Sequence, residues 1–392
     1  MDEPAWWPKG IALSSPSEAL AEGQLRTAYG RTEIWDFQNL QSPEGWASPP
    51  QEGTVWGDWK SGISTVETLA ITPIGMTLLL DSSIMAMIHP AHVGDDVSRL
   101  SRYDPWKKAL IQHPILLPIG GLSVDGNDRV LLFPMHDSLP FDDQESTVIE
   151  LVEALGAIHT SLESFTTPNT ERRWNDRLKD VEDKLKTNTM WRAPHSSTTL
   201  GLPRLHLSLE SLVEVDGKRM FLPMSRSLSE HLLCESDRLP SLASLMMLEH
   251  QWARKEGLSE QQRQNLLETW SKSVPSSWSS RQALSTVRGG AWVWRYHARI
   301  LELAQAKAYS DDESVKACEQ WLRDVSRLQA YLGVLRLWKS GEWVGITGLA
   351  VSFFSWKLAT LTEGQSLLLA ALSIGVGIAT NAIYRFKDPK PY

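Results

Sequence analysis

The sequence predicts an α+β fold followed by a C-terminal helical hairpin, and three observations support this. Short apolar runs bounded by turn residues occupy residues 65–136, a pattern typical of strands. Patterns with helical spacing dominate the chain after residue 240. Two apolar stretches of nineteen residues each then follow near the C-terminus. Strands first and helices later is an order typical of α+β proteins.

Composition limits the classes of protein to consider. The chain has 392 residues, of which 42% are hydrophobic and 22% charged, so we expect a packed globular core. A formal net charge of -8 argues against a general nucleic-acid binder, and we expect no nucleic-acid partner. The two cysteines, Cys234 and Cys318, predict neither a disulfide framework nor a zinc site. A reducing, cytoplasmic setting is therefore expected.

Residues 1–64 are rich in Pro, Gly, Ser and Trp and have no sustained periodicity, which predicts a loop-rich arm. Two roles are open for its tryptophans: anchoring the arm to the domain surface, or lining a groove for a ligand or peptide. Six tryptophans belong to this arm: Trp6, Trp7, Trp35, Trp46, Trp56 and Trp59.

Strand patterns begin after the arm. Three short apolar runs, at 65–73, 76–83 and 84–90, predict consecutive strands. Helical spacing over 95–111, broken by a proline, predicts a helix in that range. Residues 113–135 predict two further strands around an Asp-Gly-Asn-Asp turn.

The next segments are mostly helical. The apolar face of 145–165 predicts a helix that packs on the core, and the charged segment 170–190 predicts an exposed amphipathic helix. A β-hairpin is predicted over 204–224, with its turn at an Asp-Gly pair. Residues 239–338 are helical in pattern.

Four stretches in this order resemble the protein-kinase-like superfamily. They are QHPILLPIGGL, VIELVEALGAIHTSL, LHLSLESLVEVDGKRMFLPMS and DRLPSLASLMMLEH. A spacer of roughly forty residues between Ser161 and His206 is similar to the aminoglycoside-phosphotransferase branch. The resemblance covers about residues 65–335. It implies a two-lobed protein-kinase-like fold, with a small β-rich lobe at 65–140 and a larger helical lobe at 141–340.

The resemblance also locates the positions where a phosphotransferase keeps its essential groups. The lysine of the third strand falls at Ile88, or at Met87 after a shift of one residue. The catalytic aspartate falls at Ser208, and the two metal ligands fall at Ser211 and Pro223. None of these side chains supplies the required charge.

Two further parts of the family's site are missing from the sequence. The turn that would hold a glycine-rich loop has the single Gly75, and the helix after the third strand has no glutamate between Val97 and Gln112. We therefore predict a pseudokinase, which is not an enzyme, with ATP and Mg²⁺ not expected as cofactors.

Alternative residues for the chemistry lie close to the degenerate positions. They are His206, Glu210, Glu214 and Asp216. If they act, the chain is a divergent small-molecule or lipid phosphotransferase of the aminoglycoside-phosphotransferase type. If they do not, His206 is a buried structural residue, and the acids form a solvated strand edge and an Asp-Gly turn. The third interpretation is a plain α+β module in which the kinase-like order of the four stretches is accidental.

Residues 341–386 predict two transmembrane helices. The stretch 343–361 has one charge, Lys357, and 366–384 has none; each is about 28 Å long as a helix, close to the hydrocarbon thickness. Basic residues flank both ends of the hairpin, so the N-terminal domain and the short tail, 387–392, are expected in the cytoplasm. A buried helical pair and a re-entrant hairpin are the alternatives.

Together these patterns predict a membrane-tethered pseudokinase that scaffolds or regulates an unknown protein partner. Confinement to a membrane suits such a role, because it raises the effective concentration of two bound proteins. The divergent phosphotransferase is the alternative.

Overall fold

The computed structural model describes residues 4–11, 24–140, 144–169, 171–187, 199–233, 238–286 and 289–387. Cys234 and residues 388–392, most of the predicted tail, lie outside the described residues.

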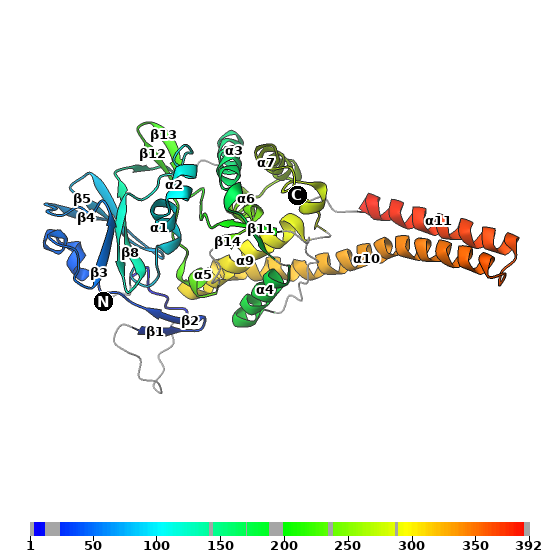
Figure 1. Ribbon diagram of the computed structural model, residues 1–392. Coiled ribbons are helices and arrows are strands. Elements are labelled where there is room, and N and C mark those ends of the chain that lie inside the picture. Colours follow the sequence, from blue (N-terminus) through cyan, green and yellow to red (C-terminus); the bar gives the residue numbers. More distant parts are fainter. Residues whose placement is uncertain are drawn as a thin grey trace.

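The small lobe is built on a six-stranded antiparallel sheet with the strand order β3-β7-β8-β6-β5-β4 (Figure 1). The turn between β7 and β8 has positive φ angles at Asp125 and Gly126, as a tight two-residue hairpin requires. All five strands expected after residue 65 are present. The strands are β3 (Gly53–Gly57), β4 (Val66–Thr72), β5 (Gly75–Leu80), β6 (Ile84–Ile88), β7 (Gly120–Val124) and β8 (Asn127–Pro134).

The predicted helix at 95–111 is two helices, α1 (Asp95–Arg102) and α2 (Asp104–Leu110). Pro105 lies in the first turn of α2, where its missing N–H breaks no helical hydrogen bond. The break therefore divides the predicted helix at the proline and leaves both halves intact.

The N-terminal arm is more regular than the sequence predicts. It contributes the edge strand β3, two 3₁₀ turns (Gln38–Gln41 and Pro43–Trp46) and a separate hairpin, β1 (Gln24–Thr27) and β2 (Gly30–Glu33). Trp35, Phe37 and Trp46 are buried against the outer face of the sheet. Of the two roles considered for the tryptophans, anchoring therefore applies to Trp35 and Trp46: they anchor the arm and complete the core of the small lobe.

The large lobe surrounds a single extended core. Its helices lie between the sheet and the C-terminal hairpin in Figure 1. The helices are α3 (Glu145–Ser161), α4 (Glu171–Leu185), α5 (Leu228–Leu233), α6 (Ser241–Glu256), α7 (Glu260–Ser273), α8 (Arg281–Leu284) and α9 (Gly290–Tyr309). The short elements are a 3₁₀ turn (Glu163–Phe165), β9 (Asp137–Ser138), β10 (Thr167–Asn169), β11 (Thr199–Pro203), β12 (Leu212–Val215), β13 (Lys218–Phe221) and β14 (Arg238–Leu239).

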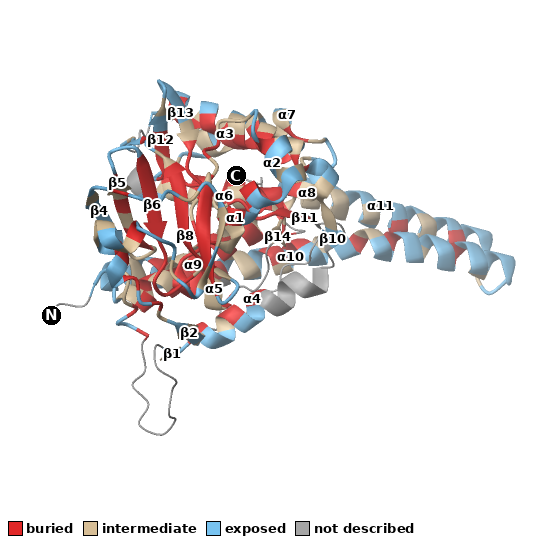
Figure 2. Ribbon diagram, turned by 60° about the vertical axis from the view of Figure 1, so that its left-hand side comes forward, coloured by how far each residue is buried: buried red, intermediate tan, exposed pale blue. Residues whose placement is uncertain are grey.

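The chain ends in two antiparallel helices that project from the large lobe (Figure 1), and their outer surface is largely exposed (Figure 2). The first, α10 (Asp312–Lys357), is continuous over 46 residues and includes most of the predicted first span. The second is α11 (Glu363–Lys387).

Within the described part of the chain, α11 is the one helix long and apolar enough to cross a membrane by the criterion of length and composition. The prediction of two spans is not supported. The apolar half of α10 contains Thr347, Ser352, Ser355 and Lys357, which lower its mean hydropathy.

Candidate functional site

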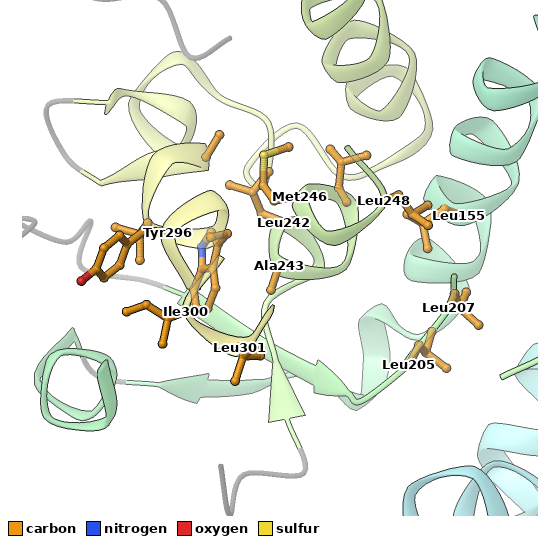
Figure 3. Packing of buried hydrophobic residues seen from close by; sticks show 14 of the residues in the cluster. Leu155, Leu205, Leu207, Leu242, Ala243, Met246, Leu248, Tyr296, Ile300 and Leu301 are labelled. Atoms are coloured by element: carbon orange, nitrogen blue, oxygen red, sulfur yellow. The ribbon is translucent and has the colours of Figure 1, made fainter. Parts of the chain in front are cut away.

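The segment after β11 alternates between core and cavity. Leu205, Leu207 and Leu209 are buried in the core of the large lobe, and Figure 3 shows Leu205 and Leu207 near Leu155 of α3. In an extended chain, neighbouring side chains point in opposite directions. His206, Ser208 and Glu210 consequently face a cavity on the other side of the segment.

This cavity, which we call the cleft pocket, has a volume of about 350 Å³, within the range of small-molecule sites. Ile74, in the turn between β4 and β5, is its contribution from the small lobe. Most of the residues that line it have polar side chains, among them carboxylates, hydroxyls and amides. The residues used below are His206, Ser208, Glu210, Ser211, Glu230, His250, Arg254, Glu302, Asp311 and Ser314.

The two lobes touch directly beside the cleft pocket. The hydroxyl of Tyr309, the last residue of α9, donates a hydrogen bond to the carbonyl of Pro73 at 2.9 Å. Pro73 precedes Ile74 in the turn to which the sequence resemblance assigned a glycine-rich loop. The contact therefore holds this turn against the large lobe.

Two of the predicted degenerate positions line the cleft pocket and two do not. Ser208 and Ser211 line it. Ile88 is fully buried on the outer face of the sheet, among the residues that pack against the arm. Met87, its neighbour in β6, faces the other way and packs with Phe133. Of the two alignments, the shift to Met87 therefore puts the lysine position on the side of the large lobe.

Pro223 is buried and is not among the residues that line the cleft pocket. Its neighbour Leu222 packs with Met87 and Phe133 between the lobes. The structure thus does not bring Ile88, Ser208 and Pro223 together at one cavity.

Of the three candidate acids, one lines the cleft pocket and two lie away from it. Glu210 lines the cleft pocket, and its amide donates a hydrogen bond to Ser208 Oγ at 3.0 Å. Glu214 is exposed on β12, whereas Asp216 has a φ of 51° in the tight turn before Gly217. Asp216 is therefore a turn residue, and Glu210 is the one of the three acids placed to meet a bound molecule.

A buried ion pair connects the two lobes. Asp96 of α1 accepts from Arg226 Nε at 2.5 Å, and both side chains are about nine-tenths buried. Arg226 follows the strand that ends near Pro223. The sequence did not reveal this pair, because an acid in the first turn of a helix has an ordinary role there and its partner lies 130 positions away.

His206 is held uncharged. Burial, with the positive charge of Arg204 as a further cause, lowers the pKa of its imidazole to about 4. Glu230 is ion-paired with Arg204, and one of its carboxylate oxygens lies 3.7 Å from His206 Nδ1. A neutral imidazole at the edge of the cleft pocket can donate one hydrogen bond and accept another.

Glu302 supplies a second acidic group. Burial raises its pKa, but the hydrogen bond from His250 and the charges of Arg254 and Arg299 outweigh burial and lower the pKa overall. His250 Nε2 lies 2.5 Å from a Glu302 carboxylate oxygen, and Arg254 Nε lies 3.0 Å from the other. The lining of the cleft pocket therefore includes a carboxylate that stays ionised.

No group of three or more His, Cys, Asp or Glu side chains that could hold a metal ion occurs in the described ranges.

No protein-family model matches the sequence, and no curated protein matches it. Several solved structures are similar in fold. A glucosamine kinase has 10% identity over 86% of this chain and 98% of its own, with a TM-score of 0.47. The GDP complex of wild-type aminoglycoside 2'-phosphotransferase-IIIa has 10% identity over 68% and 94%, with a TM-score of 0.40. An ethanolamine kinase from Plasmodium vivax has 9% identity over 68% and 81%, with a TM-score of 0.36.

These descriptions name the class of protein that the four sequence stretches resemble, the protein-kinase-like superfamily with its aminoglycoside-phosphotransferase branch. At this level of identity the likeness concerns the fold alone.

The prediction that the chain is not an enzyme is contradicted. The solved structures to which the chain is similar are described as kinases and phosphotransferases. The prediction gave more weight to the missing residues than to Glu210, which was kept as an alternative and which lines the cleft pocket. The protein partner stays a prediction.

Proposed function

We propose that the chain is a divergent small-molecule phosphotransferase whose acceptor binds in the cleft pocket. The observation that carries the proposal is the alternation at 205–210, which puts His206, Ser208 and Glu210 on one wall of a cavity next to the turn at Ile74. In the family this segment and this turn are the two sides of the transfer site.

Glu210 has the central role in the proposed reaction. The acceptor hydroxyl attacks the terminal phosphorus of a nucleoside triphosphate, its proton passes to the Glu210 carboxylate, and the bond to the leaving nucleoside diphosphate breaks. Phosphoryl transfer depends mostly on positioning the acceptor, so a single carboxylate at hydrogen-bond reach satisfies this part of the chemistry.

The proposed acceptor is a polar molecule with amine and hydroxyl groups. Glu210 and Asp311 line the same cavity, and carboxylates bind ammonium groups by charge-assisted hydrogen bonds. The names of the similar structures include glucosamine, kanamycin and ethanolamine, which all have amine groups.

The direct test is an assay of the purified chain with ATP or GTP, Mg²⁺ and each of these three amines. We expect release of nucleoside diphosphate together with a phosphorylated product seen by mass spectrometry. Glu210→Gln should lower kcat by about 100-fold or more, as expected for loss of an acid–base group. Glu214→Gln is the matched control and should leave the rate unchanged.

Two results would overturn the proposal. One is transfer no greater than in a protein-free blank with every donor and acceptor. The other is equal activity of Glu210→Gln and the unaltered chain, which would remove Glu210 from the reaction.

We propose further that the α10–α11 hairpin inserts into a membrane. Large apolar side chains are exposed around both helices. At about 100° per residue, those on α10 cover roughly two thirds of its circumference, more than one protein partner would cover. They include Trp343, Val344, Ile346, Phe353, Phe354 and Trp356 on α10 and Leu367, Leu368, Leu372, Ile374, Val376 and Ile378 on α11.

The rest of α10 faces α11, so a bilayer that takes up α11 also takes up this half of α10. Basic side chains, Arg336 and Lys339 on α10 and Arg385 and Lys387 on α11, lie at the same end of the hairpin, which supports a cytoplasmic location for that end.

Flotation of the reconstituted protein with liposomes, before and after washing with alkaline carbonate, tests the insertion. We expect the chain to stay with the lipid after the wash. Release of the protein from the liposomes by carbonate would show that it binds only at the membrane surface, and would contradict this part of the proposal.

A further inference from the structure

One uninterrupted helix connects the cleft pocket to the apolar hairpin. Asp311 caps the N-terminus of α10 by accepting from the Ser314 amide at 3.1 Å, and both residues line the cleft pocket. The same helix reaches the apolar stretch that begins at Trp343, as the length of α10 in Figure 1 shows. The pocket and the hairpin are therefore held at a fixed separation.

Charged and aromatic side chains mark where the apolar part of the hairpin begins. Lys339 Nζ lies 5.2 Å from the centre of the Tyr384 ring and 2.5 Å from a Glu342 carboxylate oxygen. Trp343, 68% exposed, follows within one turn. Lysine, tyrosine and tryptophan together are typical of the boundary between lipid and water. This boundary belt, Lys339–Trp343 with Tyr384, marks the level of the membrane surface on the hairpin.

The length of α10 then determines how far the cleft pocket lies from the membrane surface. About 25 residues separate Ser314 from Lys339, which corresponds to about 38 Å at 1.5 Å per residue. A tilt of about 40°, at the limit for membrane helices, still leaves roughly 29 Å. The headgroup layer adds only about 5–8 Å on each side of the hydrocarbon core. A lipid headgroup in its own bilayer falls short of the pocket by roughly 20 Å or more.

We infer that the acceptor is a water-soluble molecule taken from the aqueous phase, and not a lipid of the membrane that holds the hairpin. This inference rests on the proposed phosphotransferase function and on insertion of the hairpin. It decides between the two acceptor classes, small molecule and lipid, that the sequence left open.

The first experiment measures height. A fluorescent donor is attached to a cysteine at Glu313 or at Leu337, both exposed on α10, in a chain whose own cysteines are replaced by alanine. The protein is reconstituted in vesicles of phosphatidylcholine with a headgroup-labelled acceptor lipid. We expect strong energy transfer from the Leu337→Cys label and weak transfer from the Glu313→Cys label. Equally strong transfer from both positions would place the pocket at the surface and overturn the inference.

The second experiment follows the phosphate. The reconstituted chain is incubated with radiolabelled ATP, the three soluble amines, and vesicles that contain phosphatidylinositol and phosphatidylglycerol, whose headgroups have free hydroxyls. We expect label in phosphorylated products of the aqueous phase and none in the organic extract. Label in the lipid would overturn the inference.

An absence of labelled product in both phases would count against the proposed function. The energy-transfer measurement would then decide the height of the pocket by itself.

Discussion

His159 is neutral in the folded protein, for reasons that lie in its immediate surroundings. The residue is 1% exposed at the end of α3, and Trp270 Nε1 donates a hydrogen bond to His159 Nδ1 at 3.1 Å. Burial lowers the pKa of the imidazole to about 3. A proton on Nδ1 would remove the hydrogen bond and place a charge in an apolar core.

Stability should consequently fall as the pH decreases from 6.5 towards 3. In that range the unfolded chain binds a proton at His159 and the folded chain does not, so the free energy of unfolding decreases by up to about 1.4 kcal/mol per pH unit from this residue. Above pH 6.5 neither state binds the proton, and the contribution is constant. Urea unfolding in detergent at several pH values measures the slope.

The variant His159→Gln should have a shallower slope between pH 6.5 and 4 than the unaltered chain. Part of the pH dependence of the free energy of unfolding remains in this variant, because other buried histidines, including His89 and His206, also have lowered pKa values. Parallel curves for the two proteins would refute the assignment of this effect to His159.

At the scale of elements, the contact between α10 and α11 depends on small residues. A side chain added at Gly345 would meet the backbone of Gly377 and of Ser373 at 3.0 Å or less. Gly375, two residues before Gly377, has open space around its Cα. Of these two glycines of α11, only Gly377 lies at the contact with α10.

Gly377→Leu should therefore force the helices apart, and Gly375→Leu should not. Overpacking of a close contact typically costs about 1–3 kcal/mol. Cysteines introduced at the facing positions Gly341 and Thr380 report the separation by disulfide formation. We expect slower cross-linking in Gly377→Leu than in the Gly375→Leu control. Equal rates would mean that the small residues do not set the distance between the helices.

The elements also show what a sequence can and cannot predict. Leucine alternates with polar residues at 205–210, and this local pattern can be read from the sequence. The side chains that face the core and those that face the cleft pocket were therefore predictable. Which face of β6 meets the large lobe depends on strand register, and a slip of one residue exchanges Ile88 for Met87. The Asp96–Arg226 pair depends on contacts between distant segments, which no local pattern encodes. Strand β3 was missed because its central residues, Thr54–Trp56, are flanked by glycines and sit in a Pro/Gly-rich arm.

At the scale of the whole molecule, the two lobes are joined along more than the cleft pocket. Ile11 and Tyr29 of the arm are buried in the core of the large lobe, whereas Trp35 and Trp46 are buried in that of the small lobe. The arm thus bridges the lobes, and the Tyr309–Pro73 hydrogen bond and the Asp96–Arg226 ion pair also join them. Opening of the cleft would have to disrupt all of these contacts.

Tyr309→Phe should loosen the turn at Ile74 without unfolding either lobe. Loss of one hydrogen bond of about 1 kcal/mol corresponds to roughly fivefold faster amide exchange at Ile74 and Gly75. Tyr331→Phe is the control, because its hydroxyl bonds the Lys387 carbonyl at the base of the hairpin. Hydrogen exchange read by mass spectrometry distinguishes them, and unchanged exchange in Tyr309→Phe would show that the turn is held by other contacts.

The bridge made by the arm also bears on how the chain folds. The amide of Gly10 donates to the carbonyl of Ala308, and Tyr309 is 236 residues from Pro73. During synthesis the small-lobe sheet is complete long before the ribosome has made α9. The start of the arm must therefore wait undocked until the large lobe has formed, and such long-range closures are slow. We therefore expect docking of the arm on the large lobe to be a late step of folding, and a chaperone that binds apolar arm residues would act in the interval before it.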